Sequence, residues 1–191
     1  MNRHDCPADD PVYRDTALWL EKAVIGLNLC PFAKAPYVKG RVRIAVCRAK
    51  HLDGFLEALD AELQTLLAAP AAELETTLLV CPTLFDDFLL FNDMLDVAES
   101  ALADNNAEGV IQIAPFHPDF YFEGTEADDI GNYTNRSPYP TLHLIREDSI
   151  AKAAETFADP SEVFERNIAL LEKMGHAGWA ELGIPNRKGQ S

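Results

Sequence analysis

Clusters of lysine and arginine are missing from this sequence. The 191 residues contain 16 Lys and Arg against 31 Asp and Glu, so the formal net charge is −15. Neutralising nucleic-acid phosphates takes clustered basic side chains, and the composition therefore argues against a nucleic-acid-binding surface. Acidity of this size is typical of a solvated surface that keeps a protein in solution. We expect no nucleic-acid partner.

Long apolar runs are missing as well. The N-terminal residues MNRHDCPADDP have no apolar signal core, and no stretch approaches the ~18 apolar residues of a membrane span. We therefore expect a cytoplasmic protein without a membrane partner. The four cysteines, Cys6, Cys30, Cys47 and Cys81, form no CxxC pair. In the cytoplasm they are expected to be reduced thiols.

Glycine-rich loops are a third absence. The sequence has no phosphate-binding loop, no dinucleotide fingerprint and no serine nucleophile elbow. Gly124 and Gly131 are too isolated to cradle a phosphate chain. This weakens a nucleotide-dependent function, and the sequence indicates neither a cofactor nor an oligomeric state.

Helical and strand patterns alternate along the chain. Helices are expected from Pro11 to about Gly26 behind an Asp10 N-cap, over 51–67, over 84–103 behind a Thr83 and Asp86 capping box, over 149–157, and from 159 to about 174. Strands are expected at 41–47, 76–81, 110–114 and 141–146. This order predicts an α/β fold, a small sandwich whose mixed four-stranded sheet is built from βαβ units. The fourth strand either returns antiparallel at an edge or lies parallel after a wide crossing. We expect one domain over 10–182, with flexible tails at 1–9 and 183–191.

Residues 116–140, between the third and fourth strands, form the least regular segment. Connections longer than ~12–15 residues without secondary structure are uncommon and usually functional or disordered. This segment is rich in aromatic residues, which disordered segments lack. It also begins at the carboxyl end of a strand, where α/β sheets bind their ligands. We therefore predict an ordered functional loop at that rim of the sheet.

Four residues are candidates for catalysis. His117 is either a general base or metal ligand, or a turn histidine bonded to backbone. Asp129 could orient it. His143 lies on the strand face opposite two leucines, so it is in the crevice or plays a structural part. Cys30 stands near a helix end, where a thiol is either a nucleophile or a small buried apolar group.

Candidate ligand-binding residues follow in the same loop. Arg136 is its only cation and would either fork onto a substrate anion or form an internal salt bridge that ties the loop shut. Arg146, at the end of the fourth strand, is a second anion anchor or a helix-capping residue. The remaining candidates are polar neighbours of Arg136: Asn132, Tyr133, Asn135 and Ser137.

Several segments together resemble the domain of unknown function 1415 family. They are LNLCPFA (27–33), ETTLLV (75–80), DFL (87–89), FHP (116–118), DIGNYTNRSPYPTLHLIRE (129–147) and ERNIA (165–169). The resemblance covers roughly residues 13–182. It implies no established activity. It does imply that the family signature includes Cys30, His117, Asn132, Asn135, Arg136, Ser137, His143 and Arg146.

Three functions remain open at this point. The first is a hydrolase or transferase acting on a small anionic metabolite at the strand-end rim and the 116–140 loop. The second is a metal-dependent hydrolase that uses His117, His143 and one or two of Asp119, Asp128 and Asp129. The third is a non-catalytic module that binds a ligand or peptide. A loop that only plugs the end of the sheet is the structural alternative.

Overall fold

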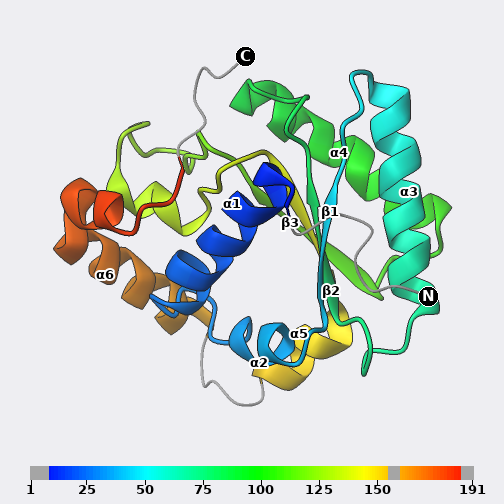
Figure 1. Cartoon of the computed structure of the whole chain (residues 1–191), viewed down its shortest axis with the longest axis horizontal. Helices are drawn as coiled ribbons and strands as arrows, with labels where there is room; N and C mark the ends of the chain where they lie inside the picture. Colours follow the sequence, from blue (N-terminus) through cyan, green and yellow to red (C-terminus); the bar gives the residue numbers. More distant parts are fainter. Residues whose placement is uncertain (1–8, 155–159, 186–191) are drawn as a thin grey trace.

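The computed structural model describes residues 9–154 and 160–185 (Figure 1). The predicted tails at 1–9 and 183–191 fall mostly outside these ranges. The elements are α1 (Pro11–Trp19), the π-helix η1 (Leu20–Ile25), α2 (Lys34–Val38), β1 (Val42–Val46), α3 (Leu52–Ala68), β2 (Thr76–Val80), α4 (Phe88–Asp104), β3 (Ile111–Phe116), the 3₁₀ helix η2 (Ile130–Thr134), β4 (Thr141–Arg146), α5 (Glu147–Ala154) and α6 (Pro160–Glu181). The predicted α/β fold with a mixed four-stranded sheet is confirmed.

The strand order is β1-β2-β4-β3. β1 and β2 are parallel, and β4 is antiparallel to both β2 and β3, so β1, β2 and β3 point the same way. The antiparallel direction was one of the two expectations for β4, but its expected position at an edge is wrong. The α4 crossover leaves one strand position empty beside β2. The 117–140 loop then returns the chain along β3, with Thr141 paired to Phe116, and β4 fills that position.

The two crossover helices, α3 and α4, cover one face of the sheet (Figure 1). Both crossovers move across the sheet in the same direction, and right-handed crossovers of that kind place their helices on one face. Leu59 and Leu63 of α3 pack there against Leu142 and Leu144 of β4. The alternation predicted for β4 is thereby confirmed. Every residue of β2 is buried, as its continuous apolar run predicted.

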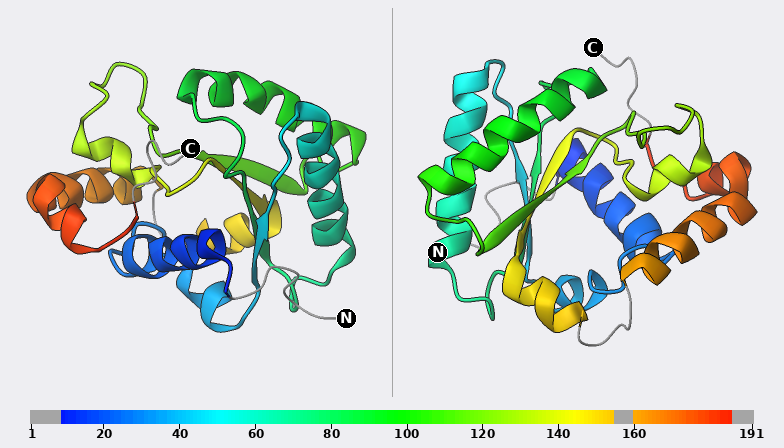
Figure 2. Two further views of the ribbon diagram at one scale, coloured as in Figure 1. Left: turned by 45° about the horizontal axis from the view of Figure 1, so that its top comes forward. Right: turned by 180° about the vertical axis from the view of Figure 1, so that it is seen from behind.

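The opposite face is covered by α1 and η1, with α2, α5 and α6 on the same side (Figure 2). Trp19 and Leu20 pack on Ile44, Leu78 and other apolar residues of the strands. The sheet therefore has a helical layer on each face. Two separate apolar cores result, one on each face of the sheet.

Helix boundaries follow the capping side chains. α1 begins as predicted, because the Asp10 carboxylate accepts a hydrogen bond from the Val12 N–H at 2.9 Å. The predicted start of α4 near Leu84 is wrong. Asp87 is its N-cap and accepts from the Leu90 N–H at 2.9 Å, while Phe85 has a positive φ of 67° that no helix tolerates. The Thr83 hydroxyl instead donates to the Ala49 carbonyl at 2.6 Å.

Thr77 gives a test of how polar groups are accommodated in the core. Its side chain is fully buried, and its hydroxyl has no hydrogen-bond partner within the described residues. A buried hydroxyl without a partner costs free energy, so Thr77→Val should leave the free energy of unfolding unchanged or raise it by up to about 1 kcal/mol. Denaturant unfolding monitored by circular dichroism measures this change.

The matched control is Thr141→Val, at an equally buried position. The Thr141 hydroxyl donates to the Tyr139 carbonyl at 2.8 Å, and its loss should lower the free energy of unfolding by about 1 kcal/mol. Equal destabilisation by both substitutions would contradict the assignment of Thr77 as an unsatisfied group.

Candidate functional site

His117 is a buried link between two loops. Its Nε2 donates to the Phe85 carbonyl oxygen at 2.8 Å, and its Nδ1 accepts from the Asp119 backbone N–H at 3.0 Å. Burial is the main influence on the imidazole and lowers its pKa, which keeps the ring neutral. Both ring nitrogens are thus engaged, and the residue joins the loop after β2 to the loop after β3. It corresponds to the backbone-bonded alternative that the sequence left open.

The polar side chains of the 116–140 loop also bond inward. Asn132 is fully buried: its side-chain oxygen accepts from the Phe122 N–H at 3.1 Å, and its amide donates to the Glu126 carbonyl at 2.8 Å. Asp129 caps η2, because its carboxylate accepts from the Gly131 N–H at 2.8 Å. These contacts stabilise the loop itself. Asp129 does not orient His117, whose two ring nitrogens bond the backbone of Phe85 and Asp119.

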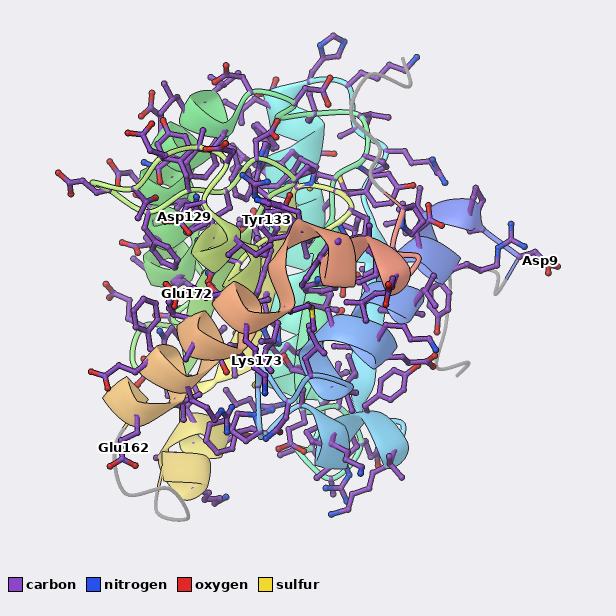
Figure 3. The ribbon with its side chains drawn as sticks, turned by 90° about the vertical axis from the view of Figure 1, so that its left-hand side faces the viewer. Asp9, Asp129, Tyr133, Glu162, Glu172 and Lys173 are labelled. Atoms are coloured by element: carbon purple, nitrogen blue, oxygen red, sulfur yellow. The ribbon has the colours of Figure 1, made fainter. Side chains whose placement is uncertain are left out.

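Arg136 closes the same loop from within. Its Nε donates to the Phe120 carbonyl at 3.1 Å, a second guanidinium nitrogen bonds the Ala127 carbonyl, and the guanidinium lies 4.3 Å from the centre of the Tyr133 ring. The internal alternative therefore holds, but with backbone carbonyls as partners in place of the expected carboxylates. Tyr133 in turn packs on Trp179 of α6, which runs across this loop (Figure 3).

The remaining ligand candidates have comparable structural partners. Asn135 donates to the Pro115 carbonyl at 3.3 Å, and Ser137 donates to the Tyr139 carbonyl at 2.6 Å. Arg146 donates to the carbonyl oxygens of Ala69 at 2.6 Å and Leu74 at 3.2 Å, just beyond the end of α3. It acts as a capping residue.

A cavity of about 570 Å³ lies on the face of the sheet that α1 and η1 cover. Its floor includes Thr76, Leu78 and His143, and its walls come from η1, the segment leading into α2, and α5. Thr76 is the first residue of β2, and α5 directly follows β4. The cavity therefore lies toward the amino ends of the parallel strands, whereas the sequence pointed to their carboxyl ends. Its volume is in the range of small-molecule sites.

His143 and Thr76 form a polar pair within this mainly apolar cavity. The Thr76 hydroxyl donates to the Leu144 carbonyl at 2.7 Å, so we assign the 2.6 Å contact between His143 Nε2 and Thr76 Oγ1 as a bond donated by the imidazole. Burial lowers the pKa of His143 to about 4, and the ring is neutral at pH 7. Nδ1 then keeps a lone pair that no described residue donates to.

Cations gather at the opening of the cavity. Lys39, Arg41 and Lys152 line it together with one acid, Glu75. The two lysines are exposed, which places them at the mouth, and Arg41 lies 3.8 Å from Glu75. Three cationic side chains and one carboxylate line this opening, although the whole chain has a net charge of −15. The mouth of the cavity therefore carries a local excess of positive charge.

Cys30 lies where this cavity meets a second one of about 250 Å³, and it lines both. The backbone N–H groups of Phe32 and Ala33 donate toward its sulfur, which favours the thiolate. Burial has the larger effect and raises the pKa of the thiol. Cys30 is therefore a protonated thiol facing the cavity at neutral pH.

The turn that holds Cys30 is built from three unusual features. It follows the π-helix η1, a form that often marks functional sites. A β-carbon at Gly26 would lie 2.4 Å from the Lys22 carbonyl oxygen, so only glycine fits there. Asn28 has a left-handed φ of 56°, and Asn167 of α6 donates to the Leu29 carbonyl at 2.7 Å. Asn167 is a positioning residue that the sequence patterns did not single out.

Two of the four catalytic candidates are thus brought together and two are not. Cys30 and His143 line one cavity. The His117 ring packs on Phe91 of α4 at 5.2 Å, on the opposite face of the sheet, while His143 faces Phe116 at 6.2 Å. The metal hypothesis needs both imidazoles in one place. Within residues 9–154 and 160–185, no group of three or more His, Cys, Asp or Glu is arranged to hold a metal ion.

The sequence patterns missed the cavity's cations and Thr76. Lys39 and Arg41 precede β1, Lys152 lies in α5, and none of the three positions carries a motif. The alternation of β4 did place His143 away from the core leucines, and that signal was sufficient to put it on this face.

A family model described as "Protein of unknown function (DUF1415)" matches residues 11–181. The chain belongs to the DUF1415 family. No curated protein and no solved structure matches it. No helix in the described part of this DUF1415 protein is long and apolar enough to cross a membrane. Of the residues placed in its signature, those of the 129–137 segment fold the loop, whereas Cys30 and His143 face the cavity.

His143 should give this DUF1415 protein a measurable acid sensitivity. Its pKa falls from the ordinary 6.5 to about 4 on folding, so between these values the unfolded chain binds a proton that the native protein does not. Stability should therefore fall as the pH drops from 6.5 to 4, by at most about 3 kcal/mol from this residue. His117 acts in the same direction, so the measurement is the difference in pH dependence between wild type and His143→Gln. Parallel stability curves for the two proteins would refute the assignment.

Loss of the His117 link should be costly for folding. In His117→Phe the ring volume is kept, but the Phe85 carbonyl and the Asp119 N–H lose their partner, and we expect a loss of about 2–3 kcal/mol in the free energy of unfolding. His51→Phe is the control at an exposed position, expected to change stability by less than about 0.5 kcal/mol. Thermal and urea unfolding of both variants test this, and a stable His117→Phe protein would show that the link is dispensable.

Proposed function

We propose that this protein binds a small organic anion with an apolar body in the cavity over Thr76 and His143. The observation that carries the proposal is the set of three cations lining a mainly apolar cavity in a strongly acidic chain. An apolar cavity with a few convergent polar groups is the usual form of a small-molecule site. The net charge repels anions in general, so a local cationic opening gives selectivity.

The lining suggests how such a ligand would lie. Its apolar body would pack on Trp19, Leu78 and Phe116, and its charged group would face Lys39 and Lys152 at the mouth. Removing apolar surface from water contributes about 25 cal/mol per Å². The His143 Nδ1 lone pair would accept a hydrogen bond from a ligand N–H or O–H. The buried ring is neutral at pH 7, so it adds no charge to the floor of the cavity.

A second candidate function is covalent transfer or hydrolysis at the same cavity. The supporting observation is that Cys30 and His143, a thiol and an imidazole, both line it. Cys30 would act as the nucleophile and His143 as the group that exchanges protons with ligand or water. Because burial raises the pKa of Cys30, the thiolate would form only after a ligand or conformational change altered its surroundings. Binding is therefore the function that the geometry supports more directly.

Octanoate is a suitable probe for the proposed site, since it joins an apolar chain to one carboxylate. Calorimetric titration of the full chain should show saturable binding of octanoate and at least about tenfold weaker binding of octylammonium, which has the same chain and the opposite charge. Lys152→Glu should weaken octanoate binding about tenfold at low salt and less at high salt.

Lys173→Glu is the matched control for this substitution. Lys173 is exposed on α6 (Figure 3), and its substitution by Glu changes the net charge by the same amount. It is not one of the residues that line the cavity. Equal weakening by both substitutions would show a general charge effect and not a site. An absence of saturable octanoate binding to the wild type would overturn the proposal.

A further inference from the structure

Two cysteines at the carboxyl ends of β1 and β2 form a pair that the cavity does not use. The last paired residues of these parallel strands are Val46 and Val80, and Cys47 and Cys81 follow them directly. The ladder continues past the last pair, because the Cys47 N–H donates to the Val80 carbonyl at 2.8 Å. Both side chains belong to the core on the α3 and α4 face. They are therefore neighbours in register and on the same face, and each thiol shifts the pKa of the other.

We propose that Cys47 and Cys81 form a reversible redox site that reacts with hydroperoxides and closes to an intramolecular disulfide. The site is independent of the proposed anion cavity, which lies on the opposite face of the sheet and is lined by Cys30.

Strand geometry permits this bond. Neighbouring strands lie about 4.8 Å apart, and disulfides join Cα atoms separated by about 4.4–6.8 Å. The β-carbons of a disulfide are usually closer than those of parallel in-register neighbours, so closure must draw the two strand ends slightly together. A disulfide formed against such a constraint is easily reduced. Ready reduction is the property that distinguishes a reversible site from a structural disulfide.

The two sulfurs have different roles. Hydrogen bonds from the Cys81 thiol and from the Ala49 N–H stabilise the Cys47 thiolate and lower its pKa to about 6, whereas the same contact and burial raise the pKa of Cys81. Cys47 is also the more accessible of the two, with 6% of its surface exposed against 1% for Cys81. Cys47 is therefore the attacking thiolate and Cys81 the resolving thiol.

The reaction balances with hydrogen peroxide as the oxidant. The Cys47 thiolate attacks one peroxide oxygen, an S–O bond forms, the O–O bond breaks, and the departing hydroxide takes up a proton to leave as water. The Cys81 sulfur then attacks the Cys47 sulfenic acid, the S–S bond forms, and the S–O oxygen leaves as a second water with the Cys81 proton. The two sulfurs together lose two electrons, which the peroxide accepts. A small dithiol such as dithiothreitol reverses the oxidation by exchange.

Mass spectrometry of the full chain tests the proposal. Reduced protein is treated with hydrogen peroxide, denatured, alkylated and mapped. We expect two alkylation sites to be lost, a peptide that links Cys47 to Cys81, and recovery of both sites with dithiothreitol. Cys30→Ala should behave like the wild type. Cys81→Ala should stop at a Cys47 sulfenic acid that dimedone traps, and Cys47→Ala should slow oxidation of Cys81 by at least about tenfold.

A wild-type measurement protects the test against variants that fail to fold. Because the Cys47 pKa is about 6, the rate at which the reduced protein consumes hydrogen peroxide should rise with pH around a midpoint near 6 and then level off. A rate that keeps rising through about pH 8, as for an ordinary thiol, would overturn the proposal. So would retention of both alkylation sites after peroxide treatment, or a disulfide that uses Cys30. None of these results bears on octanoate binding, so this site and the cavity can fail separately.

Discussion

The antiparallel pairing of β4 between two parallel strands is the constraint on which the rest of this structure depends. It places the end of β3 beside the start of β4, so the 117–140 segment must leave and re-enter the sheet at the same point. A long loop closed at its base has to satisfy its own polar groups. Asn132, Arg136 and Asp129 do so through bonds to nearby backbone. The same strand brings His143 to the cavity face and Leu144 to the core.

Local patterns predicted what local physics decides. Alternation indicated β1 and β4, a continuous apolar run indicated β2, and the Asp10 cap with Pro11 identified the start of α1. The position of β4 in the sheet could not be predicted in this way, because it follows from pairing with residues far away in the sequence. The hydrogen-bond partners of the loop side chains could not be predicted from the sequence either. Arg136 was expected to meet either a substrate or a carboxylate, and it bonds backbone carbonyls, which every residue carries and no sequence pattern marks.

The candidate site shows the same division. Cys30 and His143 were singled out from the sequence for reasons of residue type and position. Their shared cavity arises from segments that come together only in the fold: the turn after η1, the start of β2, and α5. Lys39 and Lys152 have no local signature, so their role at the opening could be recognised only from the structure. The sheet thus separates two proposed sites, with the cavity lined by Cys30 and His143 on one face and the neighbouring thiols of Cys47 and Cys81 on the other.

The central place of β4 also has a consequence for how the chain folds. β4 is the last strand to be synthesised, yet it pairs with both β2 and β3. Until it inserts, one edge of β2 and one edge of β3 present unpaired N–H and carbonyl groups, which are templates for association with other chains. Completion of the sheet requires a contact between distant residues and an ordered 117–140 loop, so it is expected to be a late and slow step. During synthesis the nascent protein is therefore exposed to misassembly over the interval between the emergence of β2 and that of β4.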